Sequence, residues 1–173
     1  MLILRESPDL AAAIRAVTAA AFARPELAGA PVPEAVLVDE LRAGDAWVPA
    51  LSLVALDPAG AVVGHVLCTR AHVGDAPALG LGPLSVHPDH QRRGVGLALV
   101  HAVLGAADAL DEPLVALLGD PGYYHRFGFR PAREYGITPP VADWEPHFQV
   151  RPLHGYDPAV RGGFAYPEPF SRV

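Results

Sequence analysis

The sequence predicts an α/β fold in which helices flank one mixed β-sheet. Two observations carry this prediction. Apolar runs at 50–56 and 61–70 flank Asp57-Pro58-Ala59-Gly60, and this turn chemistry between β-branched runs indicates an antiparallel hairpin. An amphipathic helical pattern at 94–110 then precedes the apolar run 114–118, so a right-handed crossover to a parallel strand is expected.

The N-terminal third predicts two helices after a short apolar run at 2–4. Ser7-Pro8-Asp9 supplies an N-cap residue, a proline at the first helical position and an early acid. A helix is therefore expected to extend to about Phe22, and a helical pattern resumes at 34–42. The first helix is indicated by apolar residues at helical spacing, namely Leu10, Ile14, Val17 and Ala21.

The third apolar run of the sheet, at 78–86, is irregular. Gly80, Gly82 and Pro83 lie in its middle, and a regular central strand does not favour these residues. We therefore expect a β-bulge or a departure from strand pairing there.

The C-terminal segment 132–173 is rich in both proline and aromatic residues. Disordered segments rarely keep so many aromatics, so further strands are expected near 149–153 and 163–166. With 173 residues, the chain has the size of one domain, and we expect a single domain over 1–173.

Composition narrows the class of protein. A net charge of −6 argues against nucleic-acid binding, which needs a clustered basic face, and an acidic protein tolerates cationic substrates such as amines. Cys68 is the only cysteine, so an intramolecular disulfide is impossible. No apolar run reaches the roughly 20 residues that span a bilayer. These features predict a cytoplasmic protein with neither nucleic acid nor membrane as partner.

An anion-binding turn is predicted where the irregular strand meets the long helix. Gly94 and Gly96 let the backbone approach a ligand, and the first N–H groups of the helix point outward with the positive end of its dipole. Arg92 and Arg93 add positive charge. The alternative interpretation is that the two glycines only permit close packing of helix and strand. A dinucleotide fingerprint would need a small residue where Leu99 stands, and a P-loop ending is absent.

The segment 91–96, Gln-Arg-Arg-Gly-Val-Gly, resembles the signature of the GNAT superfamily of N-acetyltransferases. The resemblance covers about 50–131 and implies acetyl-CoA as co-substrate, held by its pyrophosphate on the turn and by its pantetheine arm along the preceding strand. It also implies a mostly antiparallel sheet whose two central parallel strands splay apart. The residues implied in cofactor binding are Leu84, Ser85, Val86, Gln91, Arg92, Arg93, Gly94, Val95, Gly96 and Leu97.

A second part of the resemblance lies at 122–129, which is similar to the Tyr-x-x-x-Gly-Phe element of that family. Tyr124 takes the tyrosine position, which implies a catalytic role: a hydroxyl with a pKa of about 10 could protonate the leaving thiolate of CoA. The alternative is ordinary packing of an aromatic pair. For Tyr123 and His125 we expect packing and surface roles, respectively.

Two family features are missing. Leu117-Leu118-Gly119-Asp120 stands where an asparagine is often found, and the strand at 78–86 contains no titratable residue to act as general base. His65 or His72 could take that role, as could a water chain or an amine that arrives neutral.

The other histidines lack the spacing of a closed metal site, so no metal is expected. Cys68 is expected in the core.

The resulting hypothesis is an N-acetyltransferase that moves an acetyl group from acetyl-CoA to a primary amine by direct attack in a ternary complex. The amine belongs to a small molecule, a peptide or a protein, and is expected to contact the loop 22–33 and the C-terminal third. A non-catalytic acyl-CoA sensor, another acyl donor and a hydroxyl acceptor are the alternatives. The sequence leaves the oligomeric state open, with a homodimer as the commonest case.

Overall fold

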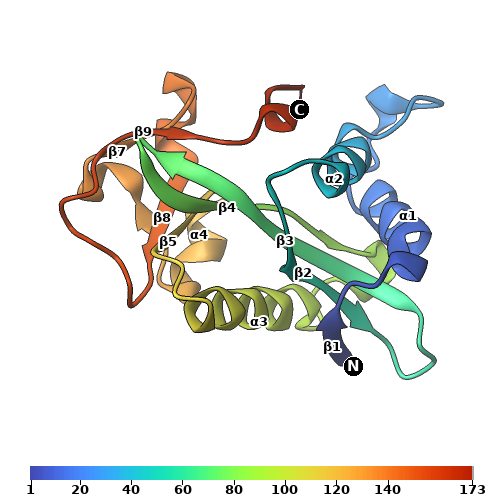
Figure 1. Ribbon diagram of the computed structural model, residues 1–173. Coiled ribbons are helices and arrows are strands. Elements are labelled where there is room, and N and C mark those ends of the chain that lie inside the picture. Colours follow the sequence, from blue (N-terminus) through green and yellow to red (C-terminus); the bar gives the residue numbers. More distant parts are fainter. Residues whose placement is uncertain (173) are drawn as a thin grey trace.

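The computed structural model describes residues 1–172, and its strands form a nine-stranded sheet (Figure 1). The sheet order is β1-β2-β3-β4-β5-β8-β6, with β9 pairing to the end of β3 and to β7. Every pairing is antiparallel except β4 with β5 and β7 with β9. This confirms the predicted mixed, mostly antiparallel sheet. The strands are β1 (Leu2–Arg5), β2 (Trp47–Leu56), β3 (Val62–Val73), β4 (Ala76–Val86), β5 (Leu114–Leu118), β6 (Arg130–Pro131), β7 (Ile137–Thr138), β8 (Phe148–Pro152) and β9 (Gly162–Ala165).

Helices cover both faces of the sheet. The helix α3 (Val95–Ala109) lies along one face, whereas α1 (Ala11–Ala21) and α2 (Pro33–Ala43) lie on the other (Figure 1). A single turn, α4 (Pro121–Tyr124), follows β5. Short 3-10 turns complete the chain: η1 (Pro8–Leu10), η2 (Pro25–Leu27), η3 (Pro88–His90), η4 (His125–Phe127), η5 (Ala132–Tyr135), η6 (Ala142–His147) and η7 (Glu168–Arg172).

The strand β2 shows why the central strands have apolar residues at almost every position of their sequence. Successive side chains of a strand point to opposite faces, so a strand covered on both faces is apolar throughout. Leu51 and Leu53 pack in the core cluster that contains the α3 side chains. Val54 packs in a separate cluster with Ile14 of α1 and Leu41 of α2.

The parallel strands β4 and β5 separate after only two residue pairs, Leu79 with Val115 and Gly80 with Ala116. In the antiparallel partner of β4, Val66 faces Leu84 while Cys68 faces Leu81, so β4 holds one extra residue there. This is the bulge that Gly82 and Pro83 predicted. From residue 81 onward, the edge of β4 that faces β5 has no strand partner in the described chain.

The other sequence predictions differ from the structure in detail. The predicted strands near 149–153 and 163–166 are present as β8 and β9, but the two-residue strands β6 and β7 gave no sequence signal. Ser7 takes the predicted N-cap position, with Pro8 and Asp9 after it, but this is the N-cap of the 3-10 turn η1, which leads into α1, and the Ser7 side chain makes no capping hydrogen bond.

A buried polar cluster joins Glu6, the residue after β1, to β2, β3 and α2. Glu6 accepts hydrogen bonds from Arg42 Nε and Ser52 Oγ, both at 2.5 Å, and Ser52 Oγ lies 2.9 Å from His65 Nε2. Burial raises the pKa of Glu6, but the hydrogen bonds from His65, Arg42 and Ser52 outweigh it and lower the pKa from 4.5 to about 2. Glu6 is therefore ionised in the folded protein at neutral pH.

Glu6→Gln is expected to lower the free energy of unfolding at pH 7 by on the order of 2 to 3 kcal/mol. Because the pKa of Glu6 is depressed in the folded state, its stabilisation is complete above about pH 4.5 and is lost as the pH falls towards 2. Urea unfolding of both proteins between pH 7 and 3 measures this. Glu26→Gln, at an exposed carboxylate, should have little effect. A penalty that stays constant over this pH range would contradict the assignment.

Candidate active site

The turn between β4 and α3 exposes unpaired backbone donors. Gln91 Nε2 donates to the carbonyl oxygen of Val86 at 3.1 Å, which ties the turn to the end of the strand. Arg92 and Gly94 adopt left-handed backbone conformations, with φ of 59° and 84°. The first helical hydrogen bond runs from Ala98 N to Gly94 O, so the three N–H groups between them have no partner within the helix. Together with the helix dipole, these donors favour an anion.

A cavity of about 500 Å³ lies against this turn, and we call it the turn cavity. Eight of the ten residues predicted to bind the cofactor line it, so most of the predicted site is brought together. Arg126 of η4 was missed by the sequence analysis; it adds a second guanidinium to that of Arg92, and its Cζ lies 5.1 Å from the ring centroid of Tyr123. The lining residues are Ala21, Phe22, Leu84, Val86, Gln91, Arg92, Gly94, Val95, Gly96, Leu97, Tyr123 and Arg126.

The two remaining predicted residues lie outside the lining. Ser85 is fully buried, and its hydroxyl donates to Thr18 Oγ1 of α1 at 3.1 Å, so its side chain does not reach the cavity. This follows from strand geometry, because the neighbouring Leu84 and Val86 point to the opposite face. Arg93 is exposed and does not line the cavity.

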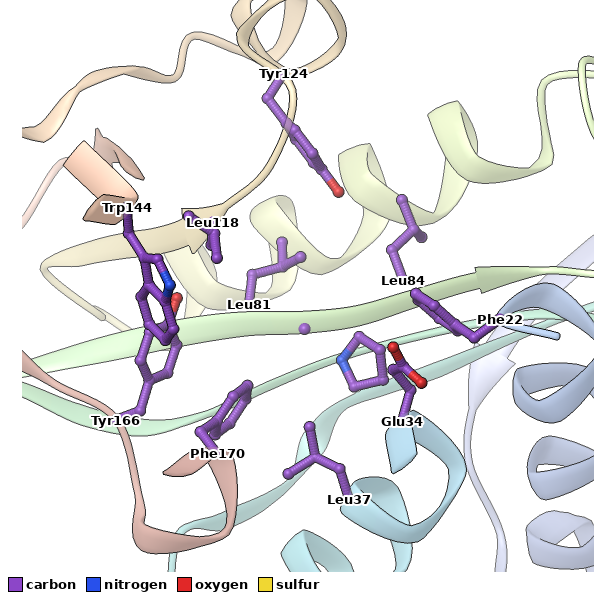
Figure 2. Close-up of a pocket in the computed structure, with 12 residues that line it drawn as sticks. Phe22, Glu34, Leu37, Leu81, Leu84, Leu118, Tyr124, Trp144, Tyr166 and Phe170 are labelled. Carbon is purple, nitrogen blue, oxygen red and sulfur yellow. The ribbon is translucent and has the colours of Figure 1, made fainter. Parts of the chain in front are cut away.

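A second cavity, of about 470 Å³, lies where β4 and β5 separate, and we call it the β4–β5 cavity (Figure 2). Phe22 and Leu84 line both cavities, so the two adjoin. In Figure 2 Tyr124 reaches the cavity from one side of β4, whereas Glu34, Leu37 and Phe170 lie on the other side. The lining residues are Phe22, Glu34, Leu37, Leu81, Gly82, Pro83, Leu84, Leu118, Tyr124, Trp144, Tyr166 and Phe170.

The hydroxyl of Tyr124 points into the β4–β5 cavity (Figure 2). Its ring makes edge contacts with Tyr123 and Phe129, with centroid separations of 4.9 and 5.8 Å. Burial, with a smaller contribution from Tyr123, raises the pKa of Tyr124 above its ordinary value. The hydroxyl is therefore protonated at neutral pH and available as a proton donor.

Glu34 is the only ionisable acid among the residues that line the β4–β5 cavity, and the sequence analysis missed it. It lies in the first turn of α2, where an acidic residue is common for helix stability alone. Arg24 Nη1 donates to Oε1 at 2.9 Å, while Oε2 is buried without a hydrogen-bond partner among residues 1–172. A signal did exist, because Glu34 adjoins the loop 22–33 expected to contact the acceptor.

The two histidines considered as general base lie outside both cavities. His65 is completely buried and bound to Ser52 in the polar cluster described above. Burial also lowers its pKa, despite the opposing effect of Glu6. His72 is exposed near the far end of β3, opposite Ala165 of β9. The structure therefore does not support a role for either histidine at this site.

Cys68 lies in the core, as expected, and burial raises the pKa of its thiol. Within residues 1–172, no group of three or more His, Cys, Asp or Glu side chains could hold a metal ion. None of the helices in the described chain is long and apolar enough to cross a membrane.

The fold and the two adjoining cavities define a protein that can hold an elongated, partly anionic ligand along the open edge of β4. A family model described as an acetyltransferase (GNAT) domain matches residues 49–131. The uncharacterized N-acetyltransferase YhbS of Escherichia coli is 34% identical over 131 residues, which cover 75% of this chain and 76% of that protein. The chain therefore belongs to the GNAT family of acetyltransferases.

Solved structures of similar proteins indicate the same family. A crystal structure of YhbS from Escherichia coli in complex with CoA has a TM-score of 0.89 and 31% identity, covering 99% of this chain and 92% of that one. A GNAT family acetyltransferase from Brucella melitensis in complex with acetyl-CoA has a TM-score of 0.78 and 36% identity, covering 98% and 97%.

Gly119→Ala is expected to destabilise the protein by about 1 to 3 kcal/mol, because a Cβ at this position would overlap the ring of Tyr124. Gly105→Ala is the matched control. An added Cβ there meets no atom within 4 Å, and alanine should stabilise α3 by about 0.5 to 1 kcal/mol. Urea unfolding gives both values. An unchanged stability for Gly119→Ala would show that the Tyr124 ring does not rest against this glycine.

Proposed function

We propose that this protein transfers the acetyl group of acetyl-CoA to a primary amine, by direct attack of the amine in a ternary complex. The observation that carries the proposal is that the turn cavity, which suits an anion, adjoins the β4–β5 cavity at Phe22 and Leu84, and that the β4–β5 cavity holds the Tyr124 hydroxyl. A cofactor anchored at the turn and extended along β4 would reach that hydroxyl. Structures of relatives in complex with CoA and acetyl-CoA support the proposal that the cofactor is acetyl-CoA.

The cofactor side of the site would use backbone and arginine donors. The free N–H groups of Val95, Gly96 and Leu97 would bind the pyrophosphate, with Arg92 and Arg126 supplying further positive charge. The unpaired edge of β4 would offer its backbone groups to the amide-containing pantetheine arm. Arg93, which is exposed, contributes only to the general potential of the turn.

In the reaction, the amine nitrogen attacks the thioester carbonyl carbon and forms the C–N bond. Backbone N–H groups at 84–86 would stabilise the oxyanion, and collapse of this intermediate breaks the C–S bond. Tyr124 would donate its proton to the departing CoA sulfur. The proton that the amine nitrogen loses would replace the one that Tyr124 gave. Holding both reactants in line supplies much of the rate enhancement. The products are an N-acetylated amine and CoA.

Gly94→Glu is expected to abolish acetyl-CoA binding, because it places a negative side chain on the anion-binding turn. Isothermal titration calorimetry measures the affinity. Gly60→Glu is a matched control, since Gly60 has nearly the same φ, 87° against 84°, and both positions are free of atoms within 4 Å of an added Cβ. The control lies in the β2–β3 turn and should bind normally. Equal binding by both variants would refute this cofactor site.

Tyr124→Phe is expected to lower kcat by about 10²-fold or more, because the thiolate loses its proton donor, with the affinity for acetyl-CoA unchanged. Thiol release in the presence of a free amine acceptor measures turnover. Tyr135→Phe is the control, since Tyr135 lines neither cavity. An unaltered kcat for Tyr124→Phe would remove Tyr124 from the mechanism, and cofactor binding without thiol release from any amine would favour a non-catalytic sensor.

A further inference from the structure

The β4–β5 cavity combines an aromatic wall with a single charged group. Four of its aromatic residues come from outside the part of the chain that matches the family model, and only Tyr124 lies inside it. Apart from Glu34, the lining has no Asp, Glu, Lys, Arg or His. The aromatic residues are Phe22, Tyr124, Trp144, Tyr166 and Phe170.

Glu34 has one carboxylate oxygen in an ion pair with Arg24 and the other without a donor. Oε1 accepts from Arg24, whose side chain is 43% exposed and does not line the cavity, whereas the Glu34 side chain is only 13% exposed. The second oxygen, Oε2, is buried and has no hydrogen-bond partner in the described chain. A buried carboxylate oxygen without a donor is unfavourable. An ammonium or amine group of a ligand would satisfy it.

The aromatic side chains are organised around the cavity rather than scattered. Tyr166 and Phe170 are stacked, with ring centroids 4.4 Å apart and an angle of 28°, and Trp144 meets Tyr166 edge to face at 6.5 Å. Figure 2 shows these three rings at one end of the cavity and Glu34 nearer Phe22. An apolar group placed among the rings would be removed from water, and the ring faces also attract cations.

We propose that this cavity selects, as acceptor, a primary amine that carries an aromatic or bulky apolar substituent and no carboxylate, with its nitrogen held by Glu34. This rests on the proposed acetyl transfer and specifies its substrate class. A volume of about 470 Å³, part of which the thioester end of the cofactor would fill, suits a small molecule rather than a folded protein surface.

The same lining rejects other amines. The carboxylate of a free amino acid would enter a cavity that already holds Glu34 and has no cationic side chain in its lining, so its charge would be left unpaired. A diamine would bring a second ammonium group without a second carboxylate. A very small amine would leave the aromatic wall uncovered.

A matched set of amines tests the selection through kcat/KM for thiol release. We expect 2-phenylethylamine to exceed L-phenylalanine, which adds a carboxylate, by at least 100-fold, and to exceed putrescine and ethylamine by at least tenfold. L-Phenylalaninamide, which masks the carboxylate, should recover most of the loss. Equal or better turnover of phenylalanine or putrescine would overturn the proposal.

Two variants assign the selection to residues. Glu34→Gln should lower kcat/KM for 2-phenylethylamine at least tenfold, mainly through KM, while Glu26→Gln, at an exposed acid in the same connection, should not. Phe170→Ala should lower kcat/KM at least fivefold for 2-phenylethylamine and less than twofold for ethylamine, a difference that general destabilisation would not produce. If Phe170→Ala affects both amines equally, or if Glu34→Gln leaves kcat/KM unchanged, the cavity is not the acceptor site.

Binding measured by fluorescence separates this inference from the proposed reaction. The chain has two tryptophans, so Trp47→Phe leaves Trp144, in the cavity wall, as the only one. Titration of this variant, saturated with CoA, should show 2-phenylethylamine binding that is lost in the Glu34→Gln background. Binding without thiol release would refute acetyl transfer but keep the amine pocket. Thiol release from other amines without this binding would refute the pocket alone.

Discussion

The separation of β4 from β5 is the constraint on which the site depends. Pairing stops after Gly80, and the bulge next to it places Leu84 and Val86 on the α3 face while Ser85 turns towards α1. A strand edge inside a protein must satisfy its backbone groups with some partner. Here neither β5 nor any other described strand supplies one, so a ligand or water must, and both cavities lie along this edge.

The two adjoining cavities have opposite electrostatic character, although the protein as a whole has a net charge of −6. At the turn, free N–H groups, the α3 dipole, Arg92 and Arg126 favour an anion, and at the other end Glu34 favours a cation. Local groups, not the overall charge, therefore decide which ligand binds where. This arrangement would orient an anionic cofactor and an amine acceptor towards one another and disfavour the reverse placement.

Short stretches of sequence were enough to predict those parts of the fold and of the site that are formed by residues close together in the chain. Asp57 accepts hydrogen bonds from the N–H groups of Ala59 and Ala61, which is the turn chemistry that indicated the hairpin. The anion-binding turn is likewise contained within a few residues. For Glu34 the only local signal was its position next to the loop 22–33, because its proposed role depends on α2 packing near β4 and on rings such as Phe170, more than a hundred residues later in the chain.

The C-terminal segment completes the proposed acceptor side through contacts that are distant in sequence. Arg172 of η7 binds Glu168 of the same turn and also Glu40 of α2. These contacts keep Phe170 beside the helix that carries Glu34. The ring of Tyr166 rests on Gly80, at the point where β4 and β5 part. The proposed acceptor wall thus comes from α1, α2 and the C-terminal third, while the turn cavity depends mainly on β4 and α3. Substitutions at Trp144 or Phe170, which do not line the turn cavity, would therefore change the acceptor while the cofactor end stays intact.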